Sequence, residues 1–126
     1  MAALFSGLKI PFSEFWRMYL DAHRRPATRL AHYLATAFGI IATLEAIDES
    51  QVGYMLGGIA ISYLIAILSH RWIEGNRPLI RINPFYGMIA DMRMCWLAAT
   101  GRLGAEYRRL GLGNPAPVEP ALAKPL

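Results

Sequence analysis

The sequence predicts an all-α protein, an integral membrane helical hairpin with flanking amphipathic, interfacial helices. Three observations predict this fold class. Hydrophobic residues make up 55% of the 126 residues and charged residues only 17%, whereas a soluble domain usually carries about a quarter of charged residues. Two apolar stretches are long enough to cross a bilayer. The charge also changes sign around these stretches, which is a signature of membrane topology.

Length and composition exclude several classes of protein. The chain has room for one domain, which we place at residues 1–110, and its Gly- and Pro-rich end, 111–126, is predicted to be disordered. Its one cysteine, Cys95, cannot form a disulfide within the chain. The net charge of +4 is not gathered into one basic segment, so we expect no nucleic acid partner.

The N-terminal part contains the first amphipathic helix. Ser13 is a candidate N-cap for a helix over Glu14–Ala22, whose aromatic residues supply a large apolar surface. Pro26 is well suited to the first turn of the next helix. Residues 1–12 have no basic region ahead of their short apolar run, so we expect no cleavable signal peptide.

Two membrane spans are predicted next, over about residues 30–47 and 52–69. The first is free of formal charge up to Glu45, and the second, VGYMLGGIAISYLIAILS, carries none. As a helix the second span reaches about 27 Å, close to the hydrocarbon thickness of a bilayer. Gly53 and Gly57 form a pattern of small residues that lets another helix approach closely. A buried helix of a soluble protein remains the alternative for the second stretch.

The charges predict the orientation of this hairpin. Residues 1–29 carry five basic and two acidic groups, residues 45–51 three acidic groups, and residues 70–126 eight basic and four acidic groups. Because basic residues favour the cytoplasmic side, both termini are expected in the cytoplasm. The membrane would be the inner membrane in a bacterium and the endoplasmic reticulum in a eukaryote.

A third apolar segment follows the hairpin. Residues Pro84–Leu103 carry a broad apolar stripe interrupted by charges, so we expect an interfacial helix or a partly inserted third helix. The small size of the chain and its glycines are compatible with a homodimer.

The three histidines of the chain, His23, His32 and His70, are predicted to meet. In an antiparallel hairpin the start of the first helix neighbours the end of the second, so all three fall at the cytoplasmic face. Neutral imidazoles bind iron, copper, nickel or zinc, and residue type alone does not choose among these metals. The alternative for each histidine is a hydrogen bond to the backbone or to lipid.

Charged residues near the histidines add further candidates. Glu74 follows His70 by one helical turn, so it is a fourth metal ligand, an acceptor that orients an imidazole, or the ion-pair partner of a nearby arginine. Asp91 is a second candidate carboxylate, with an ion pair to a nearby arginine as the alternative. Arginines suited to an acidic lipid head group, or to ordinary membrane anchoring, are Arg24, Arg25, Arg29 and Arg77.

Two motifs in these residues resemble a known family. They read Phe15-Trp16-x-x-Tyr19-Leu20-x-x-His23-x-x-Pro26-x-x-Arg29-x-x-His32 and Ser69-His70-x-x-x-Glu74-x-x-Arg77-Pro78. Over about residues 13–103 the chain resembles the small membrane proteins typified by the fungal 2-hydroxy fatty acid dioxygenase. The fungal protein has a longer membrane region between the two motifs.

The resemblance implies an iron(II)-dependent dioxygenase that shortens a 2-hydroxy fatty acid by one carbon with molecular oxygen. His23, His32 and His70 would hold Fe(II), with Glu74 as a fourth ligand or a base. Arg77, with Arg24 or Arg25, would neutralise the substrate carboxylate. The alternative function is a non-catalytic membrane module that binds lipid head groups or a protein partner.

Overall fold

The computed structural model describes residues 10–79 and 82–113, and every regular element in this part of the chain is a helix. The elements, in chain order, are α2 (Phe12–Asp21), α3 (Pro26–Asp48), α4 (Val52–Ser69), the π-helical turn η2 (His70–Glu74), α5 (Pro84–Ala99) and α6 (Leu103–Arg109). The predicted all-α fold class is confirmed. The absence of a signal peptide, predicted on residues 1–12, concerns a segment that lies mostly outside the described residues.

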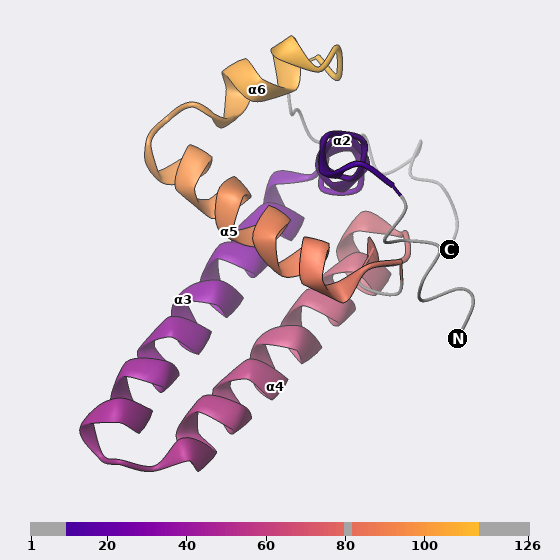
Figure 1. Cartoon of the computed structure of the whole chain (residues 1–126). Helices are drawn as coiled ribbons and strands as arrows, with labels where there is room; N and C mark the ends of the chain where they lie inside the picture. The colour runs from indigo at the N-terminus through magenta and orange to yellow at the C-terminus, as the bar shows by residue number, and fades with distance from the viewer. Residues whose placement is uncertain (1–9, 80–81, 114–126) are drawn as a thin grey trace.

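Helices α3 and α4 form a long antiparallel hairpin, on which the other helices lie only at one end (Figure 1). Helix α3 begins at Pro26, earlier than the predicted span, because the fixed φ of proline suits the first turn of a helix. Helix α4 has the predicted bounds and continues directly into η2. The chain reverses between them at Ser50, whose φ is 52°.

Small residues set the spacing of the two hairpin helices. A Cβ atom added to Gly58 of α4 would lie 2.3 Å from the Cβ atom of Ala42 on α3. One added to Gly39 of α3 would lie 2.9 Å from the hydroxyl oxygen of Ser62. Gly53 and Gly57, which form the predicted pattern of small residues, take no part in this contact, because both face open space.

The hairpin helices expose most of their apolar side chains. Pro26–Asp48 and Val52–Glu74 are long and apolar enough to cross a membrane, and only 17% and 11% of their most apolar windows are buried. A core helix of a soluble protein would be mostly buried. These two helices therefore suggest membrane association, while the cytoplasmic location of both termini stays a prediction.

Helix α2 packs its aromatic face into the core of the protein. It begins at Phe12 after Pro11, and no side chain caps it, so the predicted cap at Ser13 was wrong. Phe15 and Trp16 are almost fully buried. They pack in a cluster to which α5 and α6 also contribute, notably through Met94 of α5. The helices that contribute to this cluster lie at the open end of the hairpin, opposite its turn (Figure 1).

The predicted helix Pro84–Leu103 ends four residues earlier, and a second helix begins at Leu103. Helix α5 ends at Ala99 because Gly101 adopts a φ of 71°, in the left-handed region that favours glycine. A separate helix, α6, then runs from Leu103 to Arg109 and lies over α2. The sequence pattern did not reveal this helix, because its seven residues are too few to show a clear apolar periodicity.

Polar contacts of Trp16 join α2 to both α6 and α5. The indole of Trp16 donates a hydrogen bond of 2.8 Å to Glu106, and Arg93 lies 4.6 Å from the centre of the Trp16 ring. The hydrogen bond from Arg109, followed by that from Trp16, lowers the pKa of Glu106 to about 2.

Leu112, which the disorder prediction for 111–126 included, is buried in the core cluster. Residues 114–126 lie outside the described residues.

The contact at Gly58 predicts a difference between neighbouring glycines. Gly58→Ala should lower the free energy of unfolding by about 1–3 kcal/mol, because α3 and α4 must move apart to admit the methyl group. Gly57→Ala should raise it by up to about 1 kcal/mol, since alanine favours the helix and space is open there. Thermal unfolding followed by circular dichroism in detergent micelles measures both. Equal responses of the two variants would contradict the packing described.

Candidate metal centre

The three predicted histidines meet in one buried group. His23 lies between α2 and α3, His32 lies on α3, and His70 is the first residue of η2. Their exposed fractions are 0%, 5% and 2%. Each offers a ring nitrogen within 4.8 Å of those offered by the other two, and Nε2 of His23 lies 3.1 Å from Nε2 of His32.

The partners of the outer ring nitrogens fix the tautomer of each ring. Nδ1 of His23 lies 2.6 Å from the carbonyl oxygen of Tyr19, and Nδ1 of His32 lies 3.0 Å from that of Thr28. Nδ1 of His70 lies 2.7 Å from the side-chain oxygen of Asn76. Because these oxygens only accept hydrogen bonds, each Nδ1 carries the proton. Nε2 is therefore the unprotonated nitrogen of each of the three rings, and it is the atom available to a metal ion.

The orientation of Asn76 is itself fixed by a contact. Its amide nitrogen donates a hydrogen bond of 3.0 Å to the carbonyl oxygen of Ala22, so its oxygen must face His70. Gly75 makes this return of the chain possible, with a φ of 77° directly after η2. The backbone N–H groups of Gly75 and Asn76 both donate to the carbonyl oxygen of His70. The reversal of the chain after η2 thus brings the side chain of Asn76 back to the ring of His70, from which it accepts a hydrogen bond.

The segment that carries His23 is held from the opposite side. The carbonyl oxygen of His23 accepts a hydrogen bond of 2.8 Å from Arg29 and another of 2.8 Å from the hydroxyl of Tyr107. The ring of Tyr19 stacks on that of His23, with centroids 4.1 Å apart. Burial, followed by the neighbouring His32 and His70, holds the pKa of His23 well below its ordinary value. His23 is therefore a neutral imidazole at pH 7, the form that binds metal ions.

Glu74 lies beside the group and has other partners. Its carboxylate accepts hydrogen bonds from the backbone N–H groups of Arg24 and Arg25, each 3.0 Å long, and one of 2.6 Å from the hydroxyl of Thr28. A carboxylate at the N-terminus of α3 also suits the positive end of the helix dipole. In this arrangement Glu74 ties η2 to the start of α3. It is not in the group of residues that offer a common ligand position.

The structure places each of the predicted substrate arginines in different surroundings. Arg24 donates hydrogen bonds to Asp21 and to the carbonyl oxygen of Leu112. Arg25 is half-buried, and Arg77 is exposed directly before Pro78. None of the three lines the cavity described next.

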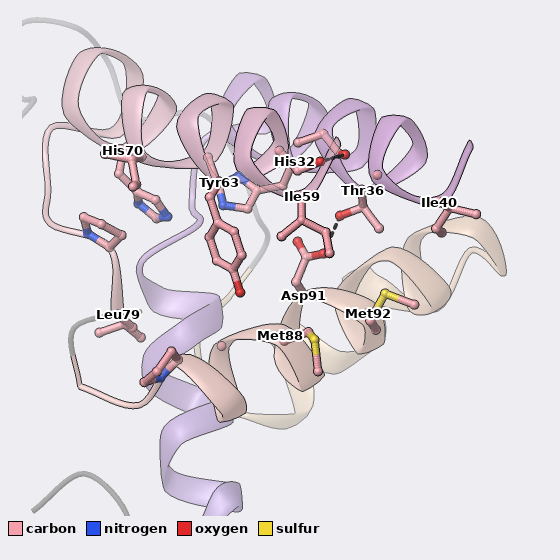
Figure 2. A pocket seen from close by; sticks show the side chains of 18 of the residues that line it. His32, Thr36, Ile40, Ile59, Tyr63, His70, Leu79, Met88, Asp91 and Met92 are labelled. Atoms are coloured by element: carbon pink, nitrogen blue, oxygen red, sulfur yellow. Dashed lines mark hydrogen bonds between the residues drawn. The ribbon is translucent and has the colours of Figure 1, made fainter. Parts of the chain in front are cut away.

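A cavity of about 390 Å³ opens beside His32 and His70. It lies between α3, α4 and α5, each of which contributes one face, and Figure 2 shows the side chains that point into it. The α3 face is formed by residues spaced three or four apart: His32, Ala35, Thr36, Gly39, Ile40, Thr43 and Leu44. Its wall is mostly apolar, and the histidines lie at one end.

Sequence reasoning missed the residues that hold the histidines. Asn76 fixes the tautomer of His70, and Tyr107 and Thr28 fix the segments on either side of His23. A glycine followed by asparagine at the end of a helix is a recognisable signal for a left-handed cap, which identifies the position of Asn76. Tyr107 carries no such local signal, since its contact with residue 23 depends on the tertiary fold.

The sequence of the chain matches a known protein family. The family described as 2-hydroxy-palmitic acid dioxygenase Mpo1-like matches residues 10–103, a segment that contains all three histidines and the cavity. No curated protein and no solved structure matches the chain. The resemblance expected from the two sequence motifs is confirmed, and the chain belongs to the Mpo1-like family.

Proposed function

We propose that this protein is an iron(II)-dependent membrane dioxygenase that performs α-oxidation of 2-hydroxy fatty acids. The observation that carries the proposal is the group of three buried imidazoles whose Nδ1 atoms all have oxygen acceptors. With protons on Nδ1, the Nε2 atoms of His23 and His32 face each other with lone pairs at 3.1 Å. A metal ion held by these residues would turn this repulsion into attraction.

The donor set fits a transition metal. Three neutral imidazoles suit iron, copper, nickel and zinc alike, and the dioxygenase description of the family favours iron(II). When bound, iron(II) would supply the activation of molecular oxygen that the reaction requires. The chain contributes the rigid placement of the imidazoles: Asn76 orients His70, and Glu74 joins the segments that carry the three rings.

The cavity fits the acyl chain of the substrate. Its apolar faces run along α3 from His32 to Leu44, a rise of about 18 Å. A fatty acid with its head group at the histidines would lay its chain along this groove, from which water is excluded by the apolar wall. Arg77, exposed beside the lining residue Pro78, would attract the carboxylate at the entrance. The hairpin would sit in the membrane with both termini in the cytoplasm.

The first prediction concerns metal binding. Purified protein should hold about one transition metal ion per chain, and His70→Ala should lose it, because two imidazoles remain. Elemental analysis after dialysis measures this. The exposed acidic group at the hairpin turn, Glu45, Asp48 and Glu49, supplies the control: Glu49→Gln should keep the ion. Metal unchanged by His70→Ala would favour the non-catalytic lipid-binding or interaction module.

The second prediction concerns Asn76. Asn76→Leu should weaken zinc binding about 10- to 100-fold, since partners of ligating histidines contribute this much. Asn76→Asp keeps an acceptor for Nδ1 of His70 but loses the bond to Ala22, so it should bind far more tightly than Asn76→Leu. Competition with a chromophoric chelator measures both affinities. Wild-type affinity in Asn76→Leu would refute the role given to this side chain.

The third prediction concerns the reaction. Protein reconstituted anaerobically with iron(II) and then given 2-hydroxypalmitate and oxygen should form the acid one carbon shorter, detected by mass spectrometry. His32→Ala should abolish the product, and Glu49→Gln should not. No product over a range of chain lengths, from protein shown to hold iron, would exclude the proposed reaction.

A further inference from the structure

Asp91 is the one residue among Asp, Glu, Lys and Arg in the described lining of the cavity. It lies on α5 and points toward α3, between Met88 and Met92 of its own helix (Figure 2). A carboxylate on an otherwise apolar wall is costly unless it has hydrogen-bond partners. Asp91 therefore needs hydrogen-bond donors, either from the protein or from a ligand in the cavity.

Two hydroxyl groups hold the Asp91 carboxylate. Tyr19 donates a hydrogen bond of 3.3 Å to Oδ1, and Thr36 donates one to Oδ2. The ion pairs formed by the described residues do not include it. An ionised carboxylate has about four acceptor positions, so these two donors leave acceptor capacity on the side of the cavity.

The carboxylate lies at the histidine end of the cavity. Thr36 is one helical turn after His32, a rise of about 6 Å. Tyr19 joins Asp91 to the metal-binding group more directly, because its ring stacks on His23 while its hydroxyl reaches Oδ1. A head group placed at the histidines therefore lies next to the free acceptor positions of Asp91.

The chemistry of the substrate decides what Asp91 can accept. Both acids carry a carboxylate that Asp91 would repel, so charge does not distinguish them, and a plain ionised fatty acid offers acceptor oxygens but no hydrogen-bond donor. A 2-hydroxy fatty acid has one donor, the hydroxyl on its second carbon. We propose that Asp91 accepts a hydrogen bond from this hydroxyl and so selects 2-hydroxy acids over plain fatty acids. This inference rests on the proposed function and adds the residue that reads the hydroxyl.

Binding without turnover tests this role. The full chain, loaded with redox-inert zinc in detergent micelles, is titrated with radiolabelled 2-hydroxypalmitate and with palmitate. The wild type should prefer the hydroxy acid, and Asp91→Asn should reduce this preference about tenfold or more, since a hydrogen bond to a charged group is lost. Asp48→Asn, the same change on the exposed hairpin turn, should keep the wild-type preference.

Thr36 supplies a second pair of variants in case Asp91→Asn does not fold. Thr36→Val removes the donor to Oδ2 with little change of shape and should lower the preference, while Thr36→Ser keeps the hydroxyl and should restore it. An unchanged preference in Asp91→Asn, or in Thr36→Val, would overturn the inference while leaving the proposed function intact. A wild type that binds neither acid would instead overturn the proposed function, and the inference with it.

Discussion

The contact on which the site depends is the hydrogen bond that each histidine makes on the outside of the group. Carbonyl oxygens of Tyr19 and Thr28 and the amide oxygen of Asn76 accept from the three Nδ1 atoms. Two of these acceptors are backbone atoms one helical turn before the ring that they bind, so helix geometry provides them. The third requires the reversal at Gly75. Together they leave three buried lone pairs on one centre, which is an arrangement that a metal ion stabilises.

The rest of the fold keeps this centre closed at one end and open at the other. Helices α2 and α6 cover the histidines with a core of large aromatic side chains, and Tyr107 reaches the backbone at His23. On the far side, small residues of α3 and α4 leave room for the cavity. The apolar surface of the hairpin faces outward, so the same helices that would contact lipid also form the walls of the cavity.

Most of the fold followed from the sequence because it depends on local signals. Uncharged stretches and their flanking charges predicted the hairpin, and the antiparallel geometry then brought the histidines to one end. Helix α6 was not predicted, because its seven residues carry charges of both signs and show little apolar periodicity. The site was predicted less completely: the sequence offered Glu74 and several arginines as polar partners, but it could not show that the start of α3 engages Glu74. It also offered Asp91 as a candidate carboxylate but could not place it, because Asp91 is distant in the chain and only the packing of α5 brings it into the same cavity as the histidines.

In the proposed site, three imidazoles with protons on Nδ1 present their Nε2 atoms to one metal ion. Side-chain nitrogen NMR of the protein labelled with ¹⁵N at histidine tests it most directly, because the chain has only three histidines. At neutral pH without metal, all three rings should show a protonated Nδ1. One equivalent of zinc should shift all three Nε2 signals together. A ring with its proton on Nε2 in the zinc-bound protein, or a response from only one or two rings, would contradict the account.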